Sequence, residues 1–311
     1  MKYIFGVDLG GTTVKNGIFT TEGDLLYKWE IPTDVSEDGR NILPDIAASC
    51  REVSARQGYP YEQFIGLGIG VPGTVTREGN VQSCVNLGWG FTRVKEILED
   101  LCGLPVMVGN DADVAALGEM WQGAGKGCSD MVMVTLGTGV GGGVIVDGKL
   151  VRGAHGFGAE IGHIRIDFQE KEFCNCGKRG CLEQYCSANG IARQAKLALE
   201  GGSQESSLRK LEKITAKSVF DAAKAGDAFA LGQVDHFGER MARALSYIAC
   251  VTDPEMFVIG GGVSKAGPIV LDAIRRYYGE NTYGRQQDVI FVIAGLENDA
   301  GIYGSAKLLI E

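Results

Sequence analysis

The order of apolar and polar residues predicts a chain that alternates short buried strands with amphipathic helices. Short apolar runs that end at glycine or proline are typical of strands, whereas apolar residues spaced three and four apart are typical of helices. The predicted strands cover residues 3–9, 14–19, 25–31, 64–71, 106–109, 131–136, 140–146, 150–152 and 256–259. Helices are predicted at 41–56, where Pro44 is expected to interrupt the helix, and at 94–101, 112–121 and 300–310, with further helices between 188 and 250.

Two stretches of the chain begin with the same pattern of strand, glycine turn, strand, turn and strand. The first stretch starts at residue 3 and the second at residue 131. We interpret this as an internal duplication with a cleft between the halves, which makes an α/β fold of two domains. The expected domains are residues 1–118, joined by the C-terminal helix at 298–311, and residues 119–297.

Length and charge narrow the possible classes of function. At 311 residues the chain is longer than a single core usually reaches, in agreement with two domains. A net charge of −9 and the lack of a long Lys or Arg run argue against nucleic acid as a partner, without excluding a nucleotide. No apolar run approaches the roughly 20 residues that span a bilayer, and Asp8 comes too early for a signal peptide. A cytoplasmic protein with no membrane partner is therefore expected.

The first glycine turn has the composition of a phosphate-binding loop. Gly10 and Gly11 lack the Cβ atoms that would hold a phosphate away from the backbone. The hydroxyls of Thr12 and Thr13 can donate hydrogen bonds to its oxygens. Asp8, just before the turn, is placed to organise Mg²⁺, in part through water. The alternative is an ordinary hairpin that contains two glycines.

A second glycine turn contains Gly137, Thr138 and Gly139 and satisfies the G-x-G-x-x-G pattern after a strand. This pattern raises a nicotinamide-dependent dehydrogenase as an alternative function. In dinucleotide-binding proteins, however, the fingerprint opens a helix, whereas here it leads into the β-rich run 140–146. A phosphate-binding hairpin fits better, and a purely structural glycine turn is the other interpretation.

A third glycine run follows the predicted strand 256–259 and contains Gly260, Gly261 and Gly262. Its bare backbone can lie flat against an adenine or a ribose, and the ligands of such sheets settle at the ends of strands. By itself the run is a weak signal. Together with the two earlier turns it predicts a nucleotide site.

Asp111 follows the predicted strand 106–109 at the point where a helix begins. An Asp at such a position is more often a helix N-cap than a catalyst, and Asp113 offers a second acid with which it could divide those roles. A predicted loop at 158–163 places Glu160 and His163 beside glycines. Because a carboxylate can accept hydrogen bonds from two adjacent hydroxyls, these acids favour a sugar as the ligand.

Cysteines are crowded in one short segment. Of nine cysteines, three stand in the spacing C-x-C-x₄-C, at Cys174, Cys176 and Cys181, shortly after His163. One His and three Cys form a closed tetrahedral set for Zn²⁺ that leaves no open position for catalysis. The sequence therefore predicts a structural zinc site that orients the neighbouring Glu160, and free thiols are the alternative.

These motifs together resemble the ROK family of sugar kinases, which includes bacterial glucokinases and kinases of N-acetylmannosamine, N-acetylglucosamine and allose. The resemblance extends over nearly the whole chain and rests on the segments 8–12, 136–143, 160–163, 174–183 and 260–262. It implies the actin-like, ribonuclease H-like fold with a hexose in the cleft between two domains, zinc on His163 and the three cysteines, and a homodimer. It also implies that Asp111 is the general base and that the sugar is held by Asn110, Asp111, Glu160, His163 and Glu183.

The expected activity is transfer of the γ-phosphoryl group of ATP, with Mg²⁺, to a hexose, and the choice is O6 of D-glucose, which gives glucose 6-phosphate. Another hexose, such as N-acetylmannosamine, N-acetylglucosamine, allose or fructose, is an alternative. Some ROK proteins are repressors with a helix-turn-helix before the kinase-like part, and because the phosphate hairpin begins at Asp8, no such domain is expected here. A sugar sensor without catalysis is the remaining alternative.

Overall fold

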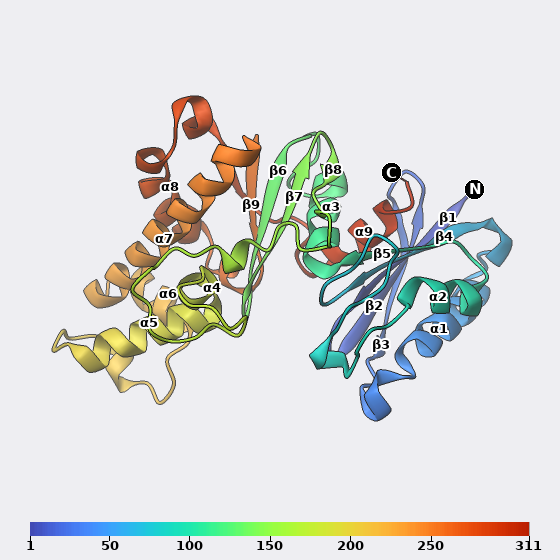
Figure 1. Cartoon of the computed structure of the whole chain (residues 1–311), viewed down its shortest axis with the longest axis horizontal. Coiled ribbons are helices and arrows are strands. Elements are labelled where there is room, and N and C mark those ends of the chain that lie inside the picture. The colour runs from blue at the N-terminus through green and yellow to red at the C-terminus, as the bar shows by residue number, and fades with distance from the viewer. Residues whose placement is uncertain (311) are drawn as a thin grey trace.

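The computed structural model describes residues 1–310 and contains two five-stranded sheets (Figure 1). The first sheet has the strand order β3-β2-β1-β4-β5, and the second, written from its other edge, has the equivalent order β8-β7-β6-β9-β10. In each sheet three antiparallel strands come first, and two strands then join in parallel. The predicted internal duplication is confirmed.

The strands are short and end at the turns that the sequence predicted. The first sheet contains β1 (Tyr3–Leu9), β2 (Thr13–Thr20), β3 (Leu25–Pro32), β4 (Phe64–Val71) and β5 (Val106–Asn110). The second contains β6 (Met131–Leu136), β7 (Val140–Val146), β8 (Lys149–Leu150), β9 (Met256–Gly260) and β10 (Ile290–Ile293). Strands β4 and β9 have parallel neighbours and are buried almost throughout, which explains their nearly continuous apolar sequence.

Helices cover both sheets. They are α1 (Ile42–Gln57), α2 (Val94–Cys102), α3 (Asp111–Gln122), α4 (Glu183–Cys186), α5 (Ala188–Gly201), α6 (Ala216–Lys224), α7 (Ala228–Thr252), α8 (Pro268–Asn281) and α9 (Ala300–Lys307). Helices α1 and α2 share one apolar core with the first sheet. Helix α9 packs directly on β1 and β4, because β4 carries Gly68 where a Cβ would lie 1.7 Å from the Ser305 carbonyl oxygen.

Helices α3 and α9 lie between the two sheets and pack against each other (Figure 1). Helix α3 also contacts β6 and β7, while α9 returns the end of the chain to the first sheet, as predicted. The division into residues 1–118 with 298–311 and residues 119–297 remains a proposal. Its boundary at 118 falls within α3, and residue 311 lies outside the described residues.

Three sequence expectations need correction. Pro44 does not interrupt α1, because it stands in the first turn, where the backbone N–H groups have no partner inside the helix. The strand expected at 150–152 is the two-residue β8, and the last helix ends at Lys307 rather than at 310. Strand β10, a short edge strand, was not predicted. Among residues 1–310, no helix has both the length and the apolar character needed to cross a membrane.

Candidate active site

Residues that the sequence singled out meet at a cavity of about 470 Å³ between the two sheets. Asp8 on β1 and Asp111 at the start of α3 lie in its wall, together with Gly137 and Gly139 after β6 and Gly261 after β9. Because β1, β6 and β9 all point their carboxyl ends at this cavity, turns far apart in the sequence become neighbours. The structure thus combines three predicted acids, Asp8, Asp111 and Glu183, and two predicted glycine turns in one site.

The remaining predicted nucleotide residues flank this cavity. The turn beside Asp8 is formed by Gly10, Gly11, Thr12 and Thr13. A hydrogen bond of 3.1 Å from Gly10 N to the Thr13 carbonyl closes this turn. Three other predicted residues stand next to the lining glycines in the second and third turns, namely Thr138, Gly260 and Gly262. A phosphate in the cavity would therefore have two hairpin turns within reach of its oxygens.

Lys15 is a site residue that the sequence analysis missed. It stands on β2 directly opposite Asp8 on β1, and it lines the same cavity. Its Nζ donates a hydrogen bond of 2.9 Å to the Asn298 carbonyl. Partial burial raises the pKa of Asp8 to about 6, and Lys15 opposes that rise while the Asp111 carboxylate adds to it. The register of the predicted hairpin, which pairs positions 8 and 15 across its turn, would have revealed this lysine.

The second glycine turn joins two antiparallel strands. Leu136 at the end of β6 pairs with Val140 at the start of β7, and the turn between them is closed by a hydrogen bond of 3.0 Å from Gly137 N to the Gly139 carbonyl. A strand, not a helix, follows the G-x-G-x-x-G pattern. The helix N-terminus on which a dinucleotide pyrophosphate rests is therefore missing here, and the dehydrogenase alternative fails.

Asp111 opens helix α3, but the N-cap of that helix is Asn110. The Asn110 Oδ1 atom accepts hydrogen bonds from the backbone N–H groups of Ala112 (2.9 Å) and Asp113 (3.3 Å), and its Nδ2 donates to the Gly73 carbonyl (3.0 Å). The capping role that the sequence offered to Asp111 or Asp113 is thus taken by their neighbour. The Asp111 side chain reaches solvent through the cavity, and the protein around that cavity displaces part of its hydration, which raises the pKa of its carboxyl group.

Asp113 is a buried acid, with 8% of its surface exposed. Burial raises its pKa to about 7, the carboxylates of Asp111 and Glu160 push it the same way, and Arg152 opposes them. Glu160 precedes the short 3₁₀ turn Ile161–His163. The structure therefore brings the Glu160 carboxylate close enough to Asp113 to raise its pKa.

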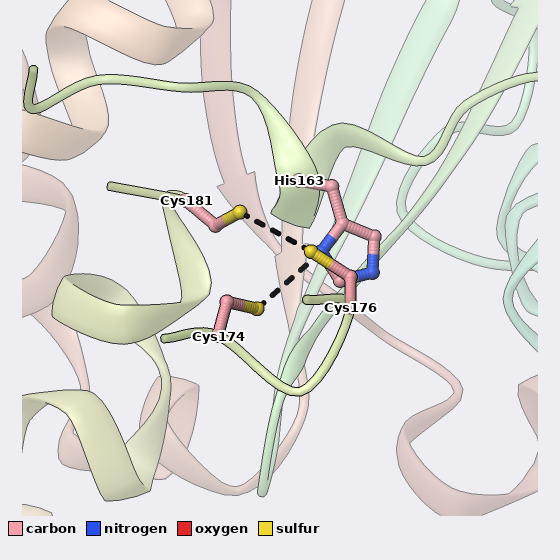
Figure 2. Close-up of side chains that lie close together, drawn as sticks. All are labelled: His163, Cys174, Cys176 and Cys181. Carbon is pink, nitrogen blue, oxygen red and sulfur yellow. Dashed lines mark hydrogen bonds between the residues drawn. The ribbon is translucent and has the colours of Figure 1, made fainter. Parts of the chain in front are cut away.

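His163 and the three cysteines form one cluster in which the four side chains point toward one another (Figure 2). All four ligand atoms lie within 4.8 Å of one another, with 3.8 Å between Cys174 Sγ and His163 Nδ1 and 3.6 Å between Cys176 Sγ and Cys181 Sγ. Sulfur ligands at about 2.3 Å from a tetrahedral zinc ion lie about 3.8 Å apart, so the cluster has the dimensions of a zinc site.

Glu183 connects this cluster to the cavity. Its Oε1 accepts a hydrogen bond of 2.8 Å from Cys174 Sγ and lies 3.9 Å from His163 Nδ1. Its Oε2 would lie 2.8 Å from a Cβ atom added to Gly139. Glu183 also lines the cavity. A side chain at Gly139 would therefore disturb an expected sugar ligand as well as a phosphate.

The fold and the site together define a class of protein: two sheets of equivalent topology that flank an acid-lined cavity form the actin-like fold of sugar kinases. The sequence profile of the ROK family matches residues 4–311. The chain belongs to the ROK family, and the resemblance inferred from its motifs is confirmed.

Similar proteins of known name agree with this assignment. The chain is 43% identical to a glucokinase of Halalkalibacterium halodurans, over 99% of this chain and 95% of that protein. It is 38% identical to a glucokinase of Thermotoga maritima, over 99% of this chain and 97% of that protein. A solved structure, a ROK family glucokinase from Streptomyces griseus in complex with glucose and AMPPNP, matches with a TM-score of 0.77 and 33% identity over 98% of each chain.

Proposed function

We propose that this protein is an ATP-dependent hexokinase that phosphorylates D-glucose at O6 to give glucose 6-phosphate. The observation that carries the proposal is that an acid with a raised pKa, Asp111, and two glycine turns line one cavity between the two sheets. The glucokinase relatives and the glucose and AMPPNP complex of the Streptomyces griseus protein support the choice of glucose and of ATP.

Asp111 acts as the general base in this proposal. One carboxylate oxygen, Oδ1, accepts a hydrogen bond of 2.9 Å from Ala112 N, which fixes the orientation of the group. The other oxygen takes the proton of the sugar hydroxyl as that hydroxyl attacks the γ-phosphorus of ATP in line. The raised pKa of Asp111 lies closer to neutral pH than that of an ordinary Asp, which makes its carboxylate a stronger base.

The sugar is held by the polar groups around Asp111. Glu160 and Glu183 accept hydrogen bonds from hydroxyls, and Asn110 keeps one amide N–H beyond the hydrogen bond to Gly73. His163 turns Nδ1 toward the cysteines, so its Nε2 is the ring nitrogen available to a sugar hydroxyl.

Asp8 and Lys15 serve the phosphate end of the cavity. The partly buried Asp8 carboxylate fits Mg²⁺, a hard cation that prefers oxygen ligands. Bound there, Mg²⁺ would neutralise charge on the β- and γ-phosphates. The Lys15 ammonium and the backbone of the turns at 10–13 and 137–139 orient the same phosphates.

A second cavity, of about 380 Å³, supports the third glycine turn as an adenosine site. Its lining includes Ala188, Phe220, Gly262 and Val263, so apolar side chains and bare backbone face a space of suitable size for a base. Lys265 stands at the same cavity and offers a positive charge to the nucleotide.

The cluster of His163, Cys174, Cys176 and Cys181 holds a structural Zn²⁺ ion in this proposal. Four protein ligands saturate a tetrahedral ion, so the metal takes no part in catalysis. Its effect is to fix the chain at Cys181, two residues before Glu183, and at the end of the 160–163 segment, so that both sugar-facing segments keep their places.

An ADP-release assay coupled to NADH oxidation tests the function with glucose, mannose, fructose, allose, N-acetylglucosamine and N-acetylmannosamine. We expect the highest kcat/KM with glucose, and a higher value with another hexose would reassign the substrate. Binding of sugar without any sugar phosphate would instead favour a sensor. We further propose that the enzyme works in the cytoplasm, feeds glucose to glycolysis and forms a homodimer, which sedimentation velocity would test.

A further inference from the structure

The chain crosses between the two halves at two places that are far apart in sequence. The first crossing is residues 123–130, which lead from α3 to β6, and the second is residues 294–299, which lead from β10 to α9. One buried side chain, Glu119 near the end of α3, contacts both crossings. Glu119 is fully buried, with 0% of its surface exposed.

The Glu119 carboxylate accepts three backbone hydrogen bonds. Its Oε2 accepts from Ala124 N in the first crossing (2.8 Å) and from Gly295 N in the second (2.9 Å), while Oε1 accepts from Leu296 N (2.8 Å). A single oxygen atom therefore bridges segments that are 171 positions apart, the difference between 295 and 124. A Cβ at Gly123 would lie 2.1 Å from the same Oε2, so the chain is shaped around this carboxylate.

Burial of the Glu119 carboxylate costs folding free energy unless all three hydrogen bonds form. A buried carboxylate is stable only when hydrogen bonds replace its lost hydration, and a buried backbone N–H without a partner is comparably unfavourable. Both crossings are therefore fixed to α3, and through it to each other.

Helix α3, which carries Glu119, and the second crossing both reach the active-site cavity. The second crossing lines the cavity with Ala294, Glu297 and Asn298, and it leads into α9, where Gly301 lies against the Asp8 carboxylate. The other end of α3 carries Asp111. We call the cavity lining from residues 294–301 the nucleotide wall. A displacement at the crossings would therefore move this wall relative to Asp111.

We propose that Glu119 is a positioning residue that joins both crossings into one hinge and holds the nucleotide wall in register with Asp111. The proposal rests on the proposed function, since it assigns this wall to ATP. Without the carboxylate, the 294–299 segment loses its anchor, and the nucleotide site loosens while the sugar side chains keep their places.

Two variants test the hinge from opposite sides. Glu119→Gln keeps the shape but turns an amide NH₂ toward at least one N–H donor. Gly295→Ala leaves the carboxylate intact and adds a Cβ that would lie 3.3 Å from Ala124 N, at the junction of the crossings. Leu98→Ala, on the buried face of α2, is the control for general loss of stability.

Isothermal titration calorimetry with MgAMPPNP and with glucose, each alone and together, measures the effect without relying on turnover. We expect Glu119→Gln to weaken MgAMPPNP about tenfold or more, the loss of a hydrogen bond to a charged group, and to change the Kd of glucose less than about twofold. Gly295→Ala should act in the same direction to a smaller extent. Leu98→Ala should lower the Tm without this split.

Equal weakening of both ligands in Glu119→Gln, or a nucleotide affinity no different from that of Leu98→Ala, would overturn the hinge. If Glu119→Gln does not fold, Gly295→Ala decides, and an unchanged nucleotide Kd in that variant rejects the proposal. A wild-type protein that binds both ligands but forms no sugar phosphate would refute the proposed function instead, and the calorimetric comparison would still judge the hinge.

Discussion

Replacement of Asp111 by Asn removes the proton acceptor and keeps the size and hydrogen-bonding capacity of the side chain. General-base catalysis contributes roughly 10²- to 10⁴-fold, or about 3 to 5 kcal/mol of barrier. We therefore expect kcat to fall by about that factor, while the Kd of the sugar changes much less. Stability should not fall, because Asn110 caps α3, an amide oxygen at position 111 can still accept from Ala112 N, and the charge that is removed is one whose pKa folding raises.

The assay is coupled ADP release at saturating glucose and ATP, with the Kd of glucose measured separately by calorimetry. Asp227→Asn is the matched control, because Asp227 caps α7 by accepting a hydrogen bond from Ala230 N and stands outside the residues that line the cavity. That variant should keep its kcat. Turnover within about threefold of wild type in Asp111→Asn would fall far short of the loss expected of a general base, and the base would have to be sought elsewhere.

Three further predictions concern the metal, the phosphate turn and the buried acid. Cys176→Ser should lower both the zinc content and the Tm, by elemental analysis and thermal scans; zinc-free wild-type protein with an unchanged melt in the variant would contradict the site. Gly137→Val should raise the KM of ATP more than that of glucose, because a Cβ at this position meets no atom of the described chain within 4 Å and projects into open space. Gly139→Val would be harder to interpret, because its side chain would also contact Glu183. Equal increases in both KM values for Gly137→Val would remove the support for a phosphate turn. Asp113→Asn should stabilise the protein at pH 8. Folding raises the Asp113 pKa from 3.8 to about 7, and the free-energy cost of ionising the buried acid grows as pH rises between these values, up to about 4 kcal/mol. The gain in Tm should disappear near pH 4, and a variant less stable than wild type at pH 8 would show that Asp113 is needed in its charged form.

The sequence by itself determined those features that depend on one segment and its immediate neighbours. Strand limits such as Tyr3–Leu9 and Phe64–Val71 follow from local apolar runs and turns. The cysteine cluster was also predictable, because its three sulfur atoms come from eight consecutive residues. The duplication was visible because each half repeats its own local pattern.

Only the tertiary structure decided what lies across the cleft and what is buried there. Asn110 caps α3, whereas the sequence had offered that role to Asp111 or Asp113, and Asp113 is buried with a raised pKa. Glu119 reads in the sequence as one more polar helix residue, yet it holds two crossings together. The physical reason is that apolar periodicity reports which face of a segment is buried, whereas the partners of a polar side chain depend on how separate segments pack.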